Sequence, residues 1–269
     1  MQSLPDIRIG HSPDPDDAFM FYGFASGQVE VPGHQIVHVL EDIQSLNERA
    51  AGPDPLEVTA MSVHAFLDQG ARYRFLEVGT SVGRGYGPRL VGLEPKPVHA
   101  LAGARIALPG PKTTATLVAR SLLPAFEEVH LDFTEIMDAV LAREVDAGVI
   151  IHEGQLTYAD HGLVLLGDFG CMFAERHDGL PLPLGVNCIR ADLPAALRTD
   201  VAAAYRRSVE IALEQRDAAV DYALQFGRGL DRELADRFVG MYVNEDSLSF
   251  HDELRRALHV LRTEYRNAR

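Results

Sequence analysis

The chain has 269 residues, of which 46% are hydrophobic and 24% are charged, and this suits a folded protein of one large domain or two smaller ones. A formal net charge of −14 opposes binding to nucleic-acid phosphates or to an anionic membrane. The first ten residues lack the basic flank and apolar run of a signal peptide, and no apolar run is long enough to span a bilayer. We therefore expect a cytoplasmic protein with neither nucleic acid nor membrane as a partner.

Segments typical of strands alternate along the chain with segments of helical spacing. This alternation favours an α/β fold with a mostly parallel sheet and helical crossovers. Strands are expected at residues 6–10, 34–40, 56–62, 104–110, 128–133 and 146–152, and helices at residues 16–27, 42–52, 113–126 and 133–144. Past residue 192 the apolar residues follow helical spacing almost throughout.

Two lobes are expected because the pattern changes in a proline-containing segment at residues 92–104. We expect the chain to return to the first lobe near residues 180–190, which read LPLPLGVNCIR. The simplest organisation is a first lobe of residues 1–100 and 190–269, which includes the C-terminal helices, and a second lobe of residues 101–189 inserted into it.

The stretch HSPDPDDAFMFYG, residues 11–23, concentrates carboxylates before an apolar helix. A calcium loop counted from Asp14 would need glycine at its sixth position, where this chain has Phe19. Asp16 and Asp17 are better placed to cap the helix that follows. Ser12 leaves the first strand at its carboxyl end, where open α/β sheets place ligand contacts, and is a candidate binding residue.

Two further stretches resemble known motifs only in part. GTSVG at residues 79–83 matches the pattern of a serine nucleophile, but a glycine-rich segment rather than a helix follows it, so we predict that Ser81 lies in a loop. LPGPKTTATL at residues 108–117 is not a nucleotide P-loop. Thr113 and Thr114 nevertheless open a helix directly after a strand, and they form either a seat for a carboxylate or phosphate or a simple helix cap.

His152 follows the buried strand formed by residues 148–151, together with Glu153. A histidine at a strand end is a candidate general base near neutral pH, and a purely structural histidine is the alternative. His34 and His38 are four residues apart, but their segment has a strand pattern rather than that of a helix presenting metal ligands. The sequence contains neither a metal-ligand spacing nor a GxGxxG after a strand, so we expect neither a metal nor a dinucleotide cofactor.

The segments HSPDPDDAFMF, VTAMS, KTTA, GVIIHE and GLPLPLG, taken in order, resemble the menaquinone-biosynthesis family of the futalosine pathway. Within it they look most like the 1,4-dihydroxy-6-naphthoate synthases, over nearly the whole chain from Ile7 to about Ser249. The resemblance implies a two-lobed fold of the type 2 periplasmic-binding-protein class, with a cleft between the lobes and C-terminal helices. It also implies a lyase that converts cyclic dehypoxanthinyl futalosine to 1,4-dihydroxy-6-naphthoate without a cofactor.

The same resemblance implies roles for individual residues. His152 matches the family's proton acceptor. Apart from the resemblance, Glu153 is a candidate for orienting the imidazole, although adjacent residues that leave a strand tend to point apart. Ser62 and Thr114 would hold the anionic end of a small carboxylate substrate. The full set of implied or candidate substrate-binding residues is Ser12, Ala60, Met61, Ser62, Thr113, Thr114, Ala115, Leu182 and Tyr242. The sequence leaves open whether the protein is a monomer or a homodimer.

The chain departs from those synthases in two segments. They usually read SPCPNDTF where this chain has SPDPDDAF, which places Asp14, Asp16 and Ala18 at the positions of Cys, Asn and Thr. They also carry a lysine two residues before the substrate-binding serine, where this chain has Ala60. Because an unpaired buried carboxylate is costly, Lys112 becomes the candidate substitute for that lysine.

Two alternatives to the synthase remain open at the level of sequence. One is the chorismate dehydratase of the same pathway, although the histidine of GVIIHE argues against it. The other is a cytoplasmic small-anion-binding protein, because this fold mostly serves solute capture and needs no catalytic base to do so. The Asp-rich opening and Ala60 favour that second alternative.

Overall fold

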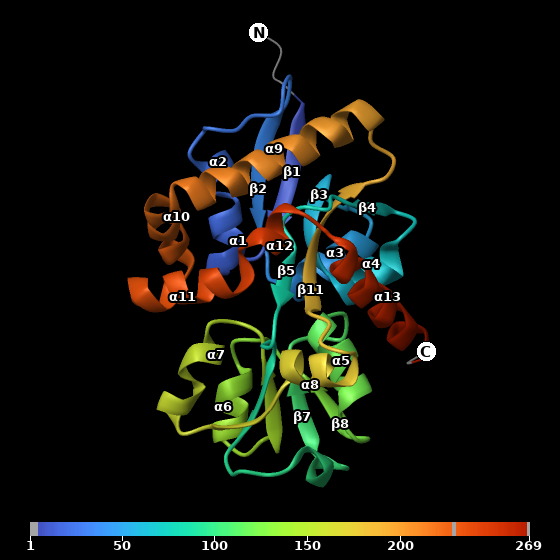
Figure 1. Ribbon diagram of the computed structural model, residues 1–269, viewed down its shortest axis with the longest axis vertical. Helices are drawn as coiled ribbons and strands as arrows, with labels where there is room; N and C mark the ends of the chain where they lie inside the picture. Colours follow the sequence, from blue (N-terminus) through green and yellow to red (C-terminus); the bar gives the residue numbers. More distant parts are fainter. Residues whose placement is uncertain (1–4, 228–229, 268–269) are drawn as a thin grey trace. The chain divides into compact units, whose positions relative to one another are not determined.

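The computed structural model describes residues 5–227 and 230–267. Residues 1–4, 228–229 and 268–269 of the predicted first lobe lie outside the described residues. The chain forms two compact units, the first comprising Met1–Val82 and Gly185–His251 and the second comprising Gly83–Leu184 and Asp252–Arg269. These are called unit 1 and unit 2 below, and Figure 1 labels most of their elements.

Unit 1 contains a six-stranded sheet in which β1, β2 and β3 are parallel and β11 runs antiparallel to β3 and β4. Its strand order is β2-β1-β3-β11-β4, and β5 pairs with β11. The strands are β1 (Asp6–His11), β2 (Gln35–Leu40), β3 (Val58–Ser62), β4 (Tyr73–Phe75), β5 (Ser81–Gly83) and β11 (Leu182–Arg190).

Alternate residues of β1 point to opposite faces of the sheet, and helices cover both faces. Ile7 and Ile9 join an apolar cluster with Tyr205 of α9, whereas a side chain at Gly10 would meet Leu46 of α3. The helices of unit 1 are α1 (Pro15–Met20), α2 (Tyr22–Ala25), α3 (Ile43–Ala51), α4 (Val63–Gln69), α9 (Ala195–Glu214), α10 (Arg216–Ala223), the 3-10 helix η3 (Leu224–Phe226), α11 (Arg232–Tyr242) and α12 (Glu245–Leu248).

Unit 2 contains a five-stranded sheet with the order β10-β6-β9-β7-β8. Strands β7, β8 and β9 are parallel, and β6 is antiparallel to β9 and β10. The strands are β6 (Arg89–Gly92), β7 (Arg105–Leu108), β8 (Glu127–His130), β9 (Ala147–Ile150) and β10 (Val164–Asp168). The helices are η1 (Val98–Leu101), α5 (Thr114–Leu122), α6 (Ile136–Leu141), α7 (Gly154–Thr157), η2 (Tyr158–His161), α8 (Phe169–Arg176) and α13 (Asp252–Asn267).

The units differ from the predicted lobes in three places. Residues 185–189 belong to unit 1, because this part of β11 pairs with β3 and β4. Residues 83–100 belong to unit 2 because β6 pairs there with β9 and β10. The last helix, α13, also belongs to unit 2, where it packs against α5. The proline-containing segment that suggested a boundary therefore lies within unit 2, between β6 and β7.

Three local predictions were wrong. The helix expected at residues 16–27 is broken at Phe21, whose N–H is shared between the carbonyls of Asp17 and Ala18. Asp16 and Asp17 both lie in the first turn of α1, where a carboxylate suits the helix, but the N-cap residue is Asp14, without a side-chain capping bond. Asp17 accepts from the backbone N–H of Ser12, which precedes the helix, and so does not cap it. The residue expected in a loop, Ser81, begins β5, because residues 81–83 pair with β11.

Candidate functional site

In unit 1, two predicted site residues lie at the carboxyl ends of neighbouring strands. Ser12 follows β1 and Ser62 is the last residue of β3, and because these strands are parallel their carboxyl ends share one edge of the sheet. The Ser12 hydroxyl donates to Asp14 Oδ2 at 2.8 Å. This edge is where open α/β sheets bind ligands.

Ser62 is held by Asn47 through two hydrogen bonds. Asn47 Nδ2 donates to Ser62 Oγ at 3.0 Å, and Asn47 Oδ1 accepts from the Ser62 backbone N–H at 2.9 Å. Both residues are buried, with exposed fractions of 2% for Asn47 and 4% for Ser62. Because the Ser62 oxygen accepts from Asn47, its hydroxyl hydrogen is oriented to donate elsewhere.

The opening motif carries titratable groups whose pKa values are shifted by burial. Burial raises the pKa of Asp17 to about 6, and it also raises the pKa of Asp16, which Asp17 and Asp14 raise further. Burial lowers the pKa of His11 to about 4, and the His11 ring stacks on Phe21 at 4.0 Å between centroids. At Asp16, Asp17 and His11, burial thus disfavours the charged form.

In unit 2, the start of α5 combines a helix cap with a second polar contact. Thr113 is the N-cap residue, and its Oγ1 accepts from the Thr116 N–H at 3.2 Å. The Thr114 hydroxyl donates to the Leu184 carbonyl at 2.6 Å. The capping interpretation of Thr113 is thus confirmed, and the backbone N–H groups of Thr114 and Ala115 lie in the first turn, where helices have no intrahelical acceptors.

His152 follows β9 and is buried, with an exposed fraction of 9%. Its Nδ1 accepts from the Gly154 backbone N–H at 3.0 Å, and Glu153 Oε2 lies 3.8 Å from the same nitrogen. The Phe133 ring meets the imidazole edge-on, with 5.5 Å between centroids. Backbone and aromatic contacts thus fix this ring locally.

The structure groups some of the predicted residues and separates others. Thr113, Thr114 and Ala115 follow β7 and His152 follows β9, and because these strands are parallel neighbours the residues occupy one edge of the unit 2 sheet. The remaining predicted residues lie in well-packed surroundings. Ala60 packs with two leucines, Met61 and Leu182 are fully buried, and Tyr242 packs edge-on against Phe238.

Sequence reasoning missed two residues that contact the predicted ones, Asn47 and Gly154. Asn47 could have been found, because it stands between Leu46 and Ala50 on the buried face of α3, where a polar side chain needs a partner. Gly154 carried no such signal, since its effect depends on how closely the His152 ring approaches it.

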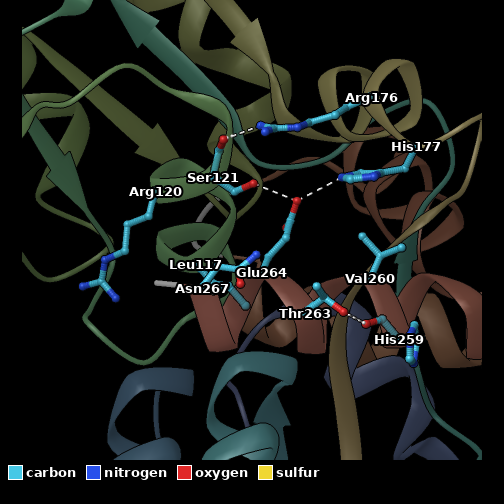
Figure 2. A pocket seen from close by; sticks show the side chains of 10 residues that line it. All are labelled: Leu117, Arg120, Ser121, Arg176, His177, His259, Val260, Thr263, Glu264 and Asn267. Atoms are coloured by element: carbon cyan, nitrogen blue, oxygen red, sulfur yellow. Dashed lines mark hydrogen bonds and ion pairs between the residues drawn. The ribbon is translucent and has the colours of Figure 1, made fainter. Parts of the chain in front are cut away.

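A cavity of about 480 Å³ lies elsewhere in unit 2, among α5, α8 and α13. Figure 2 shows Glu264 of α13 at its polar centre, where Glu264 Oε1 accepts from Ser121 Oγ at 2.7 Å and from His177 Nε2 at 2.9 Å. Glu264 Oε2 is buried and has no hydrogen-bond partner within the described ranges. None of the predicted site residues lines this cavity, and its contacts attach α13 to the rest of unit 2.

Two negative findings apply to the part of the chain that the structure describes. Within residues 5–227 and 230–267, no three His, Cys, Asp or Glu side chains gather as metal ligands would. Among the same residues, no helix is long and apolar enough to cross a membrane.

The fold is that of periplasmic binding proteins, as predicted. The chain is similar to the alkanesulfonate-binding protein from Xanthomonas axonopodis pv. citri, with a TM-score of 0.68 at 17% identity over 90% of this chain and 86% of that one. It is also similar to the periplasmic aliphatic sulphonate binding protein from Escherichia coli, with a TM-score of 0.69 at 14% identity over 99% and 88%. At such identities the likeness shows the fold alone.

Residues 7–267 match the family described as menaquinone biosynthesis, and the chain belongs to this family. It is 39% identical to a 1,4-dihydroxy-6-naphthoate synthase of Thermus thermophilus over 94% of this chain and 91% of that protein. It is 36% identical to the synthase of Streptomyces coelicolor over 90% and 86%. A crystal structure of an Archaeoglobus fulgidus protein matches with a TM-score of 0.93 at 44% identity over 98% and 97%. The family match and the two synthases support an enzyme of menaquinone biosynthesis.

Proposed function

We propose that the chain is a carbon–carbon lyase that converts cyclic dehypoxanthinyl futalosine to 1,4-dihydroxy-6-naphthoate, with His152 as the proton acceptor. The observation that carries the proposal is its 39% and 36% identity to two synthases of that name, each over at least 90% of this chain. His152 supports it, because it is a buried histidine that follows a parallel strand and has its ring orientation fixed by neighbours.

Ser62 and the start of α5 each carry donors suited to the anionic end of the substrate. The Ser62 oxygen accepts from Asn47, so the Ser62 hydroxyl can donate to a carboxylate. The Thr114 hydroxyl donates to the Leu184 carbonyl, so the donors at that position are the backbone N–H groups of Thr114 and Ala115 at the start of α5. Helix N-termini favour anions, which suits a small carboxylate substrate.

The test is incubation of the purified protein with cyclic dehypoxanthinyl futalosine, with the product followed by absorbance and mass. We expect the naphthoate product from the wild type and its loss in His152→Asn, with folding checked by circular dichroism. His161→Asn is the matched control, because His161 lies exposed in η2 of the same unit. Full turnover by His152→Asn would refute the role of His152.

Two other outcomes would replace the proposed activity. Product from chorismate, and none from the futalosine derivative, would identify a dehydratase. Tight binding of a metabolite that is recovered unchanged would identify a binding protein. The departures from the synthases at Asp14, Asp16 and Ala60 would then be attributed to that binding function.

A further inference from the structure

Gly154 contacts the His152 imidazole in two ways, one of them through its backbone N–H. That N–H donates to His152 Nδ1 at 3.0 Å. A ring nitrogen that accepts a hydrogen bond carries no hydrogen of its own, so in the neutral imidazole the hydrogen is on Nε2. The hydrogen bond therefore selects one of the two tautomers of His152.

The second contact depends on the missing side chain of Gly154. A Cβ at residue 154 would lie 2.6 Å from His152 Cε1, 3.1 Å from His152 Nδ1 and 2.9 Å from Met137 Sδ. The separations from Cε1 and Sδ are shorter than a Cβ atom tolerates, and the separation from Nδ1 is tight. The methionine is flexible and can move away, but the imidazole is also packed against Phe133. Any larger residue at position 154 must therefore displace the ring.

The backbone that carries Gly154 is itself held in place by Arg89 of β6. Arg89 Nη1 donates to the Gln155 carbonyl, and its guanidinium lies over the Tyr158 ring, 5.5 Å from the centroid. The segment after His152 is thus tied to the sheet of unit 2. Because of these ties, the Gly154 N–H cannot easily follow a displaced imidazole.

We infer that Gly154 is a positioning residue, which selects the Nε2–H tautomer of His152 by its N–H and keeps the ring in place by its missing Cβ. The inference rests on the proposed function, in which His152 takes up a proton. In this tautomer the basic lone pair is on Nδ1, so proton uptake breaks the bond to Gly154. The new Nδ1–H then faces Glu153, whose Oε2 lies 3.8 Å away. This gives Glu153 a function as counter-ion to the imidazolium.

The first measurement is nitrogen NMR of wild-type protein labelled in its 11 histidines, with the His152 signals assigned by their absence in His152→Asn. We expect a pyridine-type Nδ1 and a pyrrole-type Nε2 for the neutral ring. The reverse pattern would overturn the inference. Because this measurement needs no substrate, it tests the tautomer even if the protein turns over no futalosine derivative.

The second measurement compares Gly154→Ala with the double variant Gly154→Ala/Met137→Ala. Displacement of the ring predicts a fall in kcat of about 10²-fold, with KM little changed and the tautomer signals altered, in both variants. If the collision with Met137 were the whole effect, the double variant would recover wild-type kcat and signals, and the positioning role would be refuted. If neither variant folds, the wild-type spectrum still decides the tautomer.

Discussion

Replacing Asp17 by asparagine should stabilise the protein near neutral pH. Asp17 has an exposed fraction of 9%. Burial raises its pKa to about 6 from an ordinary value of 3.8, although the backbone N–H of Ser12 donates to its Oδ2 at 2.9 Å and opposes the rise. An asparagine side chain retains an oxygen that can accept this bond, so the variant removes the buried charge and keeps the contact.

The size of the effect follows from the shift in pKa. One pKa unit corresponds to about 1.4 kcal/mol, so a rise from 3.8 to about 6 corresponds to about 3 kcal/mol. A carboxyl whose pKa is higher in the folded state binds its proton more tightly there. Its ionisation therefore weakens the fold as the pH rises from about 4 to about 6. Above that range we expect Asp17→Asn to be more stable than wild type by about 1–3 kcal/mol.

His11 has the opposite dependence in the same range of pH. Burial lowers the pKa of His11 to about 4 from 6.5, so the unfolded state takes up a proton between these values while the folded state does not. This contribution lowers stability as the pH falls through that window. In the wild type the effects of Asp17 and His11 largely cancel. Asp17→Asn should therefore lose stability on acidification from pH 6.5 to 4 more steeply than the wild type does.

The assay is urea unfolding at pH 7.5, 6.0 and 4.5 for the wild type, Asp17→Asn and the control Glu30→Gln. Glu30 is exposed, so this control removes one negative charge without changing a buried group. At pH 7.5 we expect Asp17→Asn to unfold at a higher urea concentration than the wild type. At acid pH the two unfolding midpoints should converge. A lower midpoint at pH 7.5, with Glu30→Gln unchanged, would mean that the ionised carboxylate stabilises the fold and would refute the reasoning.

The remaining predictions concern single buried contacts, each measured by the same unfolding assay at pH 7.5. Tyr205→Phe should be neutral or stabilising by up to about 1 kcal/mol, because the Tyr205 hydroxyl is buried without a hydrogen-bond partner in the described residues; a loss above that size would contradict this. Asn47→Ala should cost about 1–3 kcal/mol, since it leaves the buried Ser62 without its two bonds; an unchanged midpoint would show that other groups replace Asn47. Glu264→Ala should cost about 1–3 kcal/mol, and Glu264→Gln less because it keeps an acceptor for the two donors. Equal losses in the two Glu264 variants would show that charge, not the acceptor, matters.

The order of strands and helices could be predicted, but the direction of several strands could not. Periodicity and turn residues report local conformation, and they placed β1, β3, β7 and β9 within a few residues. Strands β6 and β11 run antiparallel to their neighbours. An apolar strand has the same residue pattern in either direction, so a mixed sheet was not predictable from pattern alone.

The candidate site shows the same division between local and non-local information. The residues at strand ends, Ser12, Ser62 and His152, could be located because a strand that ends in a polar residue is visible in the sequence. Their partners are not visible, since Asn47 reaches Ser62 from a different helix and Gly154 acts by close approach.

Those partners determine what each strand-end residue can do. Ser12 donates its hydroxyl hydrogen to Asp14 and so presents an acceptor, whereas Ser62 accepts from Asn47 and so presents a donor. His152 accepts at Nδ1 and therefore carries its hydrogen on Nε2. From the sequence alone, a serine hydroxyl or a histidine ring nitrogen can either donate or accept a hydrogen bond. The surrounding hydrogen bonds determine which of the two it does. Binding and proton transfer in the proposed reaction thus depend as much on Asn47, Asp14 and Gly154 as on the residues they hold.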